Sequence, residues 1–148
     1  MPIKLIKVEK FINLPKAIIF DTDNTLYAYS PAHKLALNSV FIKAESLLDI
    51  KKDLFEKKFK EARCEVKNRI HNKASSHSRL LYIQRTIELL GFKTELLLTL
   101  DLEQTYWRTF LQSCKLYPNI RELLEMLNNL EIKTAIITDL NSQIQFRK

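Results

Sequence analysis

The sequence predicts an α/β fold in which a helical bundle is inserted between two strands of a parallel sheet. Two short, continuous apolar runs stand far apart in the chain, at residues 16–20 and 133–137. Continuous rather than alternating hydrophobicity is typical of strands buried on both faces, as in a parallel sheet covered by helices. Between the two runs, apolar residues recur at helical spacing almost throughout.

The stretch between the two strands is expected to hold five helices. Their starts are indicated by side chains that can accept hydrogen bonds from the first helical turn, and the second start resembles a capping box. Gly91 suits the residue after the third helix, because glycine readily adopts a positive φ. The expected N-terminal residues are, in order, Ser30 followed by Pro31, Asp53 with Glu56, Ser76, Thr94 and Asn119.

A division into two domains follows from the number of helices. One helix directly before a parallel strand is the ordinary crossover connection. The fifth helix fills that role, and the four helices before it are too many for a crossover. We therefore expect an α/β core made of residues 1–26 and 117–148, and a helical cap made of residues 27–116.

Composition and charge narrow the class of protein. With 46% hydrophobic and 28% charged residues, the 148-residue chain resembles a soluble globular protein. Its net charge of +7 comes from Lys and Arg that alternate with Asp and Glu, which favours a solvated helix face over a nucleic-acid groove. No stretch approaches the ~20 apolar residues of a membrane helix. The absence of a leader-like N-terminus and the small number of cysteines favour the cytoplasm. We expect neither nucleic acid nor a membrane as a partner, and the oligomeric state stays open.

The strongest chemical signal follows the first strand directly, as Asp21-Thr22-Asp23-Asn24-Thr25. Ligands of open α/β sheets bind beyond the carboxyl ends of the strands. Two carboxylates two positions apart repel each other, and a hard cation such as Mg²⁺ relieves that repulsion through oxygen ligands. One carboxylate can then attack a phosphorus atom while the other donates and later accepts a proton. The alternative is a simple turn, where Asp and Asn are also common.

The second strand ends in Ile137-Thr138-Asp139. If the two strands are neighbours, the Thr138 hydroxyl and the following N–H groups lie beside Asp21 and can donate to a phosphoryl oxygen. Taken alone, a threonine after a β-branched run is ordinary. The interpretation of Thr138 therefore depends on the first strand, and Asp139 is assigned no role.

Two segments resemble motifs of the haloacid dehalogenase-like (HAD) hydrolases. Residues 17–27, Ala-Ile-Ile-Phe-Asp-Thr-Asp-Asn-Thr-Leu-Tyr, look like the first motif of that family, an apolar strand followed by Asp-x-Asp-x-Thr. Residues 135–138, Ala-Ile-Ile-Thr, resemble the second motif, an apolar strand ending in Thr or Ser. The predicted helical insert matches the subgroup whose cap lies between these motifs. The resemblance implies an α/β fold with a partial HAD-like, Rossmann-like parallel sheet and an inserted all-helical cap bundle.

The resemblance also implies a Mg²⁺-dependent phosphohydrolase that acts on a small phosphorylated metabolite through an aspartyl phosphate. Asp21 would attack phosphorus and bind Mg²⁺ with its other oxygen. Asp23 would protonate the leaving alcohol, activate the water of the second step and bind Mg²⁺ through its carbonyl. Thr25 and Thr138 would serve the phosphate site, Thr25 by supporting the loop and Thr138 by holding the transferring group. A carboxylate at Asp23 favours phosphate esters over organohalides, because a halide needs no proton on leaving.

Two features of the family have no counterpart in this sequence. Ten residues follow Thr138, whereas family members need further strands that carry a lysine and additional acidic ligands of Mg²⁺. We therefore expect a C-terminally truncated chain with weak Mg²⁺ binding and little or no turnover. One alternative is a non-catalytic module that binds phosphate or a partner chain. A basic helical protein that binds nucleic acid is the less favoured alternative.

Within the expected cap, residues 74–79 form the most polar interruption. Arg79 and His77 could reach a substrate from there, since a guanidinium suits phosphate or carboxylate, but a helix N-terminus with capping serines is the favoured interpretation. His33 is interpreted as a surface residue. The aromatic residues Tyr106, Trp107 and Phe110 are interpreted as bundle core rather than as a platform for stacking bases.

Overall fold

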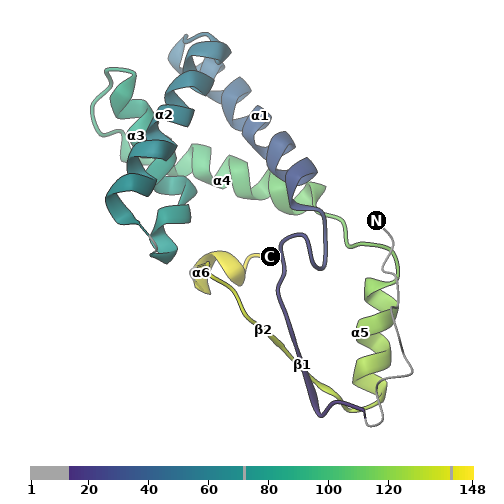
Figure 1. Ribbon diagram of the computed structural model, residues 1–148. Coiled ribbons are helices and arrows are strands. Elements are labelled where there is room, and N and C mark those ends of the chain that lie inside the picture. Colours follow the sequence, from purple (N-terminus) through teal and green to yellow (C-terminus); the bar gives the residue numbers. More distant parts are fainter. Residues whose placement is uncertain (1–13, 72, 141) are drawn as a thin grey trace. The chain divides into compact units, whose positions relative to one another are not determined.

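The computed structural model describes residues 14–71, 73–140 and 142–148 (Figure 1). The described residues form two compact units. The first, here called the sheet unit, comprises the described residues up to Ser30 together with Cys114–Thr138. The second, the helical unit, comprises Pro31–Ser113 and the described residues after Thr138. The elements are, in order, β1 Ala17–Phe20, α1 Tyr29–Leu48, α2 Lys52–Ile70, the short 3₁₀ helix η2 Ala74–His77, α3 Arg79–Leu89, α4 Leu96–Ser113, α5 Ile120–Asn129, β2 Lys133–Ile136 and α6 Ser142–Gln145.

The two predicted strands are confirmed, and they pair directly. β1 and β2 are parallel, with Ala17 opposite Lys133 and Phe20 opposite Ile136. The Ile137 N–H donates to the Phe20 carbonyl at 2.9 Å, so the pairing continues to the carboxyl end of both strands. The sheet positions the ends of both strands at one edge.

The expected burial of this sheet on both faces is wrong for the described residues. Ile19 is 65% exposed and Ile136 is 56% exposed. Among the elements that the structure describes, α5 is the one helix that contacts β2. One helix on a two-stranded sheet cannot cover both faces, which explains the exposure of apolar side chains that a larger α/β sheet would bury.

α5 is an amphipathic helix of the sheet unit, and β2 follows it in the chain. Ile120 and Leu127 are its buried residues, and Ile132 at the start of β2 is buried as well. Asn119 stands at the predicted N-cap position, but with φ 67° its side chain makes no capping hydrogen bond. The helix start is therefore at the predicted place for a different reason, a left-handed turn that Asn tolerates well.

The helical unit has an aromatic core. The Phe41 ring of α1 contacts the rings of Phe55 and Phe59 on α2 edge to face, with centroids 5.7 and 5.9 Å apart. Phe59 in turn contacts Tyr82 of α3. A second group on α4 consists of Tyr106, Trp107 and Phe110, which are buried as the sequence predicts. No helix in the described ranges is long and apolar enough to cross a membrane.

Four of the five predicted helix starts differ from the observed ones. Ser30 lies inside α1, which begins at Tyr29, and Thr94 lies two residues before the start of α4. The starts of α2 and α3 differ as well. α2 begins after Lys51 without a side-chain cap, and Asp53 lies inside the first turn. Ser76 is buried in η2, and it is Ser78 that caps α3 by accepting a hydrogen bond from the Leu81 N–H. Ser78 is the cap because Ser76 lies within η2, whereas Ser78 directly precedes α3. Gly91 is at the predicted position after α3, with φ +89°.

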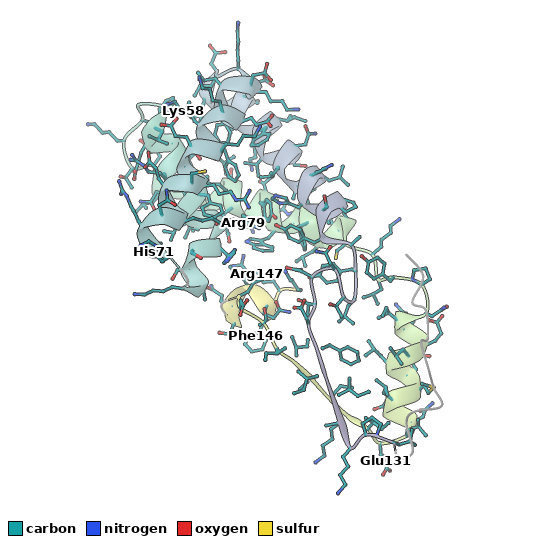
Figure 2. The ribbon with its side chains drawn as sticks, in the orientation of Figure 1. Lys58, His71, Arg79, Glu131, Phe146 and Arg147 are labelled. Atoms are coloured by element: carbon teal, nitrogen blue, oxygen red, sulfur yellow. The ribbon has the colours of Figure 1, made fainter. Side chains whose placement is uncertain are left out.

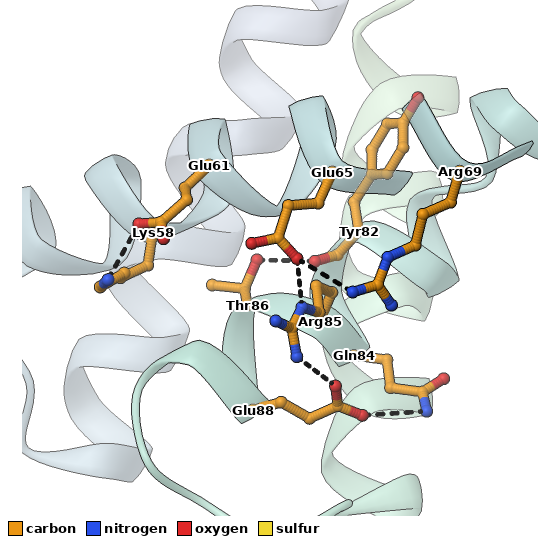
Figure 3. A network of polar contacts seen from close by, with 9 residues as sticks. All are labelled: Lys58, Glu61, Glu65, Arg69, Tyr82, Gln84, Arg85, Thr86 and Glu88. Carbon is orange, nitrogen blue, oxygen red and sulfur yellow. Dashed lines mark hydrogen bonds and ion pairs between the residues drawn. The ribbon is translucent and has the colours of Figure 1, made fainter. Parts of the chain in front are cut away.

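Charged residues form a network on the solvent side of α2 and α3 (Figure 3). The Arg85 guanidinium donates to Glu65 at 2.7 Å and to Glu88 at 3.1 Å, and thereby joins the two helices. Lys58 pairs with Glu61 at 2.9 Å. These contacts agree with the interpretation of the alternating charges as a solvated helix face.

The interpretation of His33 as a surface residue is wrong. Its Nδ1 lies 2.8 Å from the Tyr106 hydroxyl, across α1 and α4. Burial, followed by the positive charges of Arg79 and Arg63, lowers the pKa of His33 from 6.5 to about 4. His33 is therefore uncharged at neutral pH and lies half-buried between α1 and α4.

This pKa shift predicts an acid-sensitive helical unit. Because the pKa of folded His33 lies below that of the unfolded chain, the unfolded state binds the proton more readily between pH 6.5 and 4. The free energy of unfolding should be full above pH 6.5 and fall by about 1–2 kcal/mol towards pH 4, after allowance for solvent screening. Urea denaturation followed by circular dichroism measures this slope. His33→Gln should flatten it and the control His71→Gln should not, and a similar slope in both variants would contradict the assignment.

Candidate active site

The loop after β1 is a compact turn held by its own backbone. The N–H groups of Thr25 and Leu26 donate to the Thr22 carbonyl at 3.2 and 3.0 Å, and Asn24 adopts φ 64°. Asn tolerates this left-handed conformation better than most residues do. The Asn24 N–H donates to the Tyr27 carbonyl at 2.8 Å, which closes the loop. Residues 21–27 therefore have a fixed local geometry.

A further contact fixes the loop to the segment before α5. The Tyr117 N–H donates to the Leu26 carbonyl at 2.9 Å, and Tyr27 forms an isolated bridge with Leu116. Both partners belong to the sheet unit. The loop is thus supported from the strand on one side and from the chain before α5 on the other.

The two predicted carboxylates differ in their surroundings. Asp21 is exposed, and the Thr25 hydroxyl donates to its Oδ2 at 3.5 Å. Asp23 is half-buried and accepts a hydrogen bond on Oδ1 from the Tyr27 hydroxyl. The exposed carboxylate is accessible to a ligand, and the half-buried one is oriented by a neighbour. This difference suits a division of labour between a nucleophile and an acid–base group.

Tyr27 is a residue of the loop that sequence reasoning missed. It is buried, and burial together with its contact to the Asp23 carboxylate raises the pKa of the Tyr27 phenol. The phenol therefore stays protonated and keeps donating to Asp23. The one signal in the sequence was that Tyr27 follows Asp23 by four residues. That spacing predicts a contact only if the chain turns between them.

The second strand brings Thr138 to the same edge of the sheet. Phe20 pairs with Ile136, and Ile137 donates to the Phe20 carbonyl, so the chain reaches Thr138 as the other strand reaches Asp21. Thr138 is half-buried. The interpretation of Thr138 required the two strands to be neighbours, and β1 and β2 are paired.

Mg²⁺ is the cofactor that the sequence predicts for this loop. Carboxylate and carbonyl oxygens are ligands that Mg²⁺ takes, and it commonly keeps several waters. Asp21 and Asp23 supply such oxygens at the end of β1. Across the ranges that the structure describes, no group of three or more His, Cys, Asp or Glu side chains could hold a metal ion. The oxygens of the loop are therefore of the type that Mg²⁺ takes, and they would supply only part of a coordination shell.

The predicted substrate residues Arg79 and His77 lie in the helical unit. The Arg79 guanidinium lies over the rings of Tyr82 and Tyr106, 5.5 and 5.3 Å from their centroids, and donates to the His77 carbonyl at 2.7 Å. In Figure 2, Arg79 lies among the helices. Cation–π contacts and this hydrogen bond give Arg79 a structural task in the bundle. The His77 side chain, by contrast, is exposed.

Comparison with known proteins identifies several relatives. A family model described as haloacid dehalogenase-like hydrolase matches residues 15–147. A ribulose-1,5-bisphosphate 5-phosphatase from Halopiger xanaduensis is 34% identical over 133 residues, which cover 89% of this chain and 56% of the relative. The magnesium-bound crystal structure of the HAD-hydrolase YfnB from Bacillus subtilis has a TM-score of 0.53 and 20% identity, over 87% of this chain and 56% of that one. This chain spans little more than half the length of these two relatives.

Proposed function

This chain belongs to the haloacid dehalogenase-like hydrolase family, and on that premise we propose that it carries the nucleophile and the acid–base group of a Mg²⁺-dependent phosphohydrolase. The observation that carries the proposal is the fixed loop that presents Asp21 and Asp23 at the carboxyl end of β1, beside the end of β2. The phosphatase name of the Halopiger relative supports a phosphate ester as the substrate class. A small phosphorylated metabolite is the proposed substrate.

The proposed reaction has two steps. In the first, an Asp21 oxygen forms a bond to phosphorus while the bond from phosphorus to the ester oxygen breaks, and Asp23 gives its proton to that leaving oxygen. In the second, a water molecule gives a proton back to Asp23 and its oxygen bonds to phosphorus, while the bond from phosphorus to Asp21 breaks. Inorganic phosphate leaves, and both carboxyl groups return to their starting forms.

The remaining residues of the site are proposed to bind the phosphoryl group or to hold the loop in place. Thr138 is proposed to donate to an oxygen of the transferring phosphoryl group, and Thr25 to support the loop around Asp21. Tyr27 is a positioning residue, since its hydroxyl holds the Asp23 carboxylate. Mg²⁺, when bound by Asp21 and Asp23, would offset the charge that the carboxylates share with the phosphate.

We further propose that the helical unit acts as a cap over this site. Its bounds, Pro31–Ser113 with the described residues after Thr138, differ from the expected cap of residues 27–116. Its core of large aromatic residues gives it an interior of its own. A separate folded unit can exclude water from a reacting ester and select among substrates.

The leaving group provides a test of Asp23. Asp23→Asn should lower kcat/KM for an alkyl phosphate by about 10²–10⁴-fold, because an alkoxide needs a proton as it leaves. An aryl phosphate with a nitrophenolate leaving group needs no such proton, so its kcat/KM should fall by at least tenfold less. The value of kcat/KM depends only on the steps up to the transfer of the phosphoryl group to Asp21. Hydrolysis of the aspartyl phosphate therefore does not affect the comparison of the two substrates. Equal losses on both substrates would exclude the acid role.

A further inference from the structure

The helical unit contains a cavity of about 680 Å³ at the C-terminal end of α2 and along η2. In Figure 2, His71 marks the end of α2 at which the cavity lies. This volume is typical of a site for a small molecule. The lining residues are Lys67, His71, Lys73, Ala74, Ser76, His77 and Asp139.

The charge of the lining favours an anion. Two lysines, Lys67 and Lys73, face one carboxylate, that of Asp139. Within the ranges that the structure describes, no ion pair joins either lysine to a carboxylate. By contrast, Lys43 and Lys60 elsewhere in the same unit pair with carboxylates at 2.6 and 2.8 Å. The lining therefore carries an excess of positive charge, since two lysines stand against the single carboxylate of Asp139.

The negative end of the α2 dipole explains only one of the basic residues in the lining. A helix C-terminus carries a partial negative charge, which a lysine in its last turn offsets. Lys67 lies in that last turn. Lys73 and His77 lie beyond the helix, in and around η2, where this explanation does not apply.

The two imidazoles extend the set of donors. Loss of part of its contact with solvent, followed by the charges of Lys67 and Arg79, lowers the pKa of the otherwise exposed His77, while Asp139 acts in the opposite direction. A neutral imidazole donates from one ring nitrogen, and a bound anion would favour its charged form, which donates from both. His71 is exposed on the rim.

We infer that this cavity is a second phosphate site, which binds the phosphate group of a small phosphorylated ligand through Lys67, Lys73 and His77. All of its lining residues belong to the helical unit. A phosphate dianion matches several N–H donors and two cations at once, whereas a carboxylate has fewer oxygens and one charge. The inference rests on this cavity and does not depend on the hydrolytic function of Asp21.

The test is a titration of the full chain with inorganic phosphate at constant ionic strength, without Mg²⁺, followed by NMR. Saturable shifts are expected for His71, Lys73 and His77. Lys67→Gln and Lys73→Gln should each weaken binding by about 5- to 10-fold, as expected for one cation at contact distance. Lys57→Gln, which removes the same charge from an exposed position on α2, should leave the affinity unchanged.

Three results would overturn the assignment. Shifts that do not saturate would show that phosphate has no site here. An equal loss in Lys57→Gln would reduce the effect to overall charge, and an equally strong response to acetate would remove the preference for phosphate. Asp21→Asn separates this inference from the proposed function, because it should abolish hydrolysis and leave the phosphate titration unchanged. Circular dichroism confirms that each variant is folded.

Discussion

Asp21→Asn is expected to reduce the weak Mg²⁺-dependent phosphate release that this chain retains on an aryl phosphate to the uncatalysed rate. The reason is chemical: an amide oxygen is a far weaker nucleophile toward phosphorus than a carboxylate oxygen, and the residual rate comes from water. The variant should also bind Mg²⁺ more weakly, because one anionic ligand becomes neutral. Phosphate release gives the first quantity, and isothermal titration with Mg²⁺ gives the second without need of turnover.

The first half of the reaction can be measured separately. A reactive donor such as acetyl phosphate should phosphorylate the parent chain once, and intact mass spectrometry in acid should detect the product. The same donor should leave Asp21→Asn unmodified. Asp49→Asn is the matched control, since Asp49 is exposed and its φ of 51° suits Asn. Labelling that persists in Asp21→Asn, or no labelling of the parent chain, would contradict the assignment of the nucleophile.

Phe55→Ala is expected to destabilise the helical unit by about 3–5 kcal/mol. Phe55 is 0% exposed, and its ring contacts Phe41 of α1 edge to face. Removing the ring leaves a cavity between α1 and α2 that the surrounding aromatic side chains can fill only in part. Denaturation by urea, followed by the helical signal at constant pH, measures the loss.

The adjacent residue provides the control for this prediction. Leu54 lies on the same turn of α2 and is 47% exposed. Leu54→Ala therefore removes less buried surface and is expected to cost about 1 kcal/mol or less. Equal losses in the two variants would contradict the placement of Phe55 in the core.

The elements of the fold could be predicted because each carries its own local pattern. The runs around Ile18 and Ala135 are apolar and β-branched, and the helices repeat apolar residues along one face. The caps could not be predicted with the same success. Ser76 and Ser78 are chemically equal, and the choice between them depends on η2, whose short turn has no periodic signal. The exposure of the sheet depends on how many other elements cover it, which no local pattern encodes.

The same distinction holds for the candidate site. The places of Asp21 and Thr138 follow from strand ends and from parallel pairing, so sequence alone could put them at one edge. The contact of Tyr27 with Asp23 depends on the left-handed Asn24, a backbone detail that the residue types permit but do not require. The sequence offered Arg79 as a substrate residue but favoured a helix N-terminus there. The packing of Arg79 over Tyr82 and Tyr106 could not be predicted, because Tyr106 belongs to a helix distant in sequence.

The pairing of β1 with β2 has a consequence for the order of folding. Ala17 pairs with Lys133, so the sheet joins two segments that are separated along the chain by the helices from α1 to α5. Closing so long a loop in an unfolded chain costs conformational entropy, while the contacts inside each helix and between α2 and α3 are local and form quickly. Once folded, the bundle shortens the effective loop between the strands. We therefore expect the residues of the proposed chemistry to come together last, after the helices, which contribute none of them, have folded.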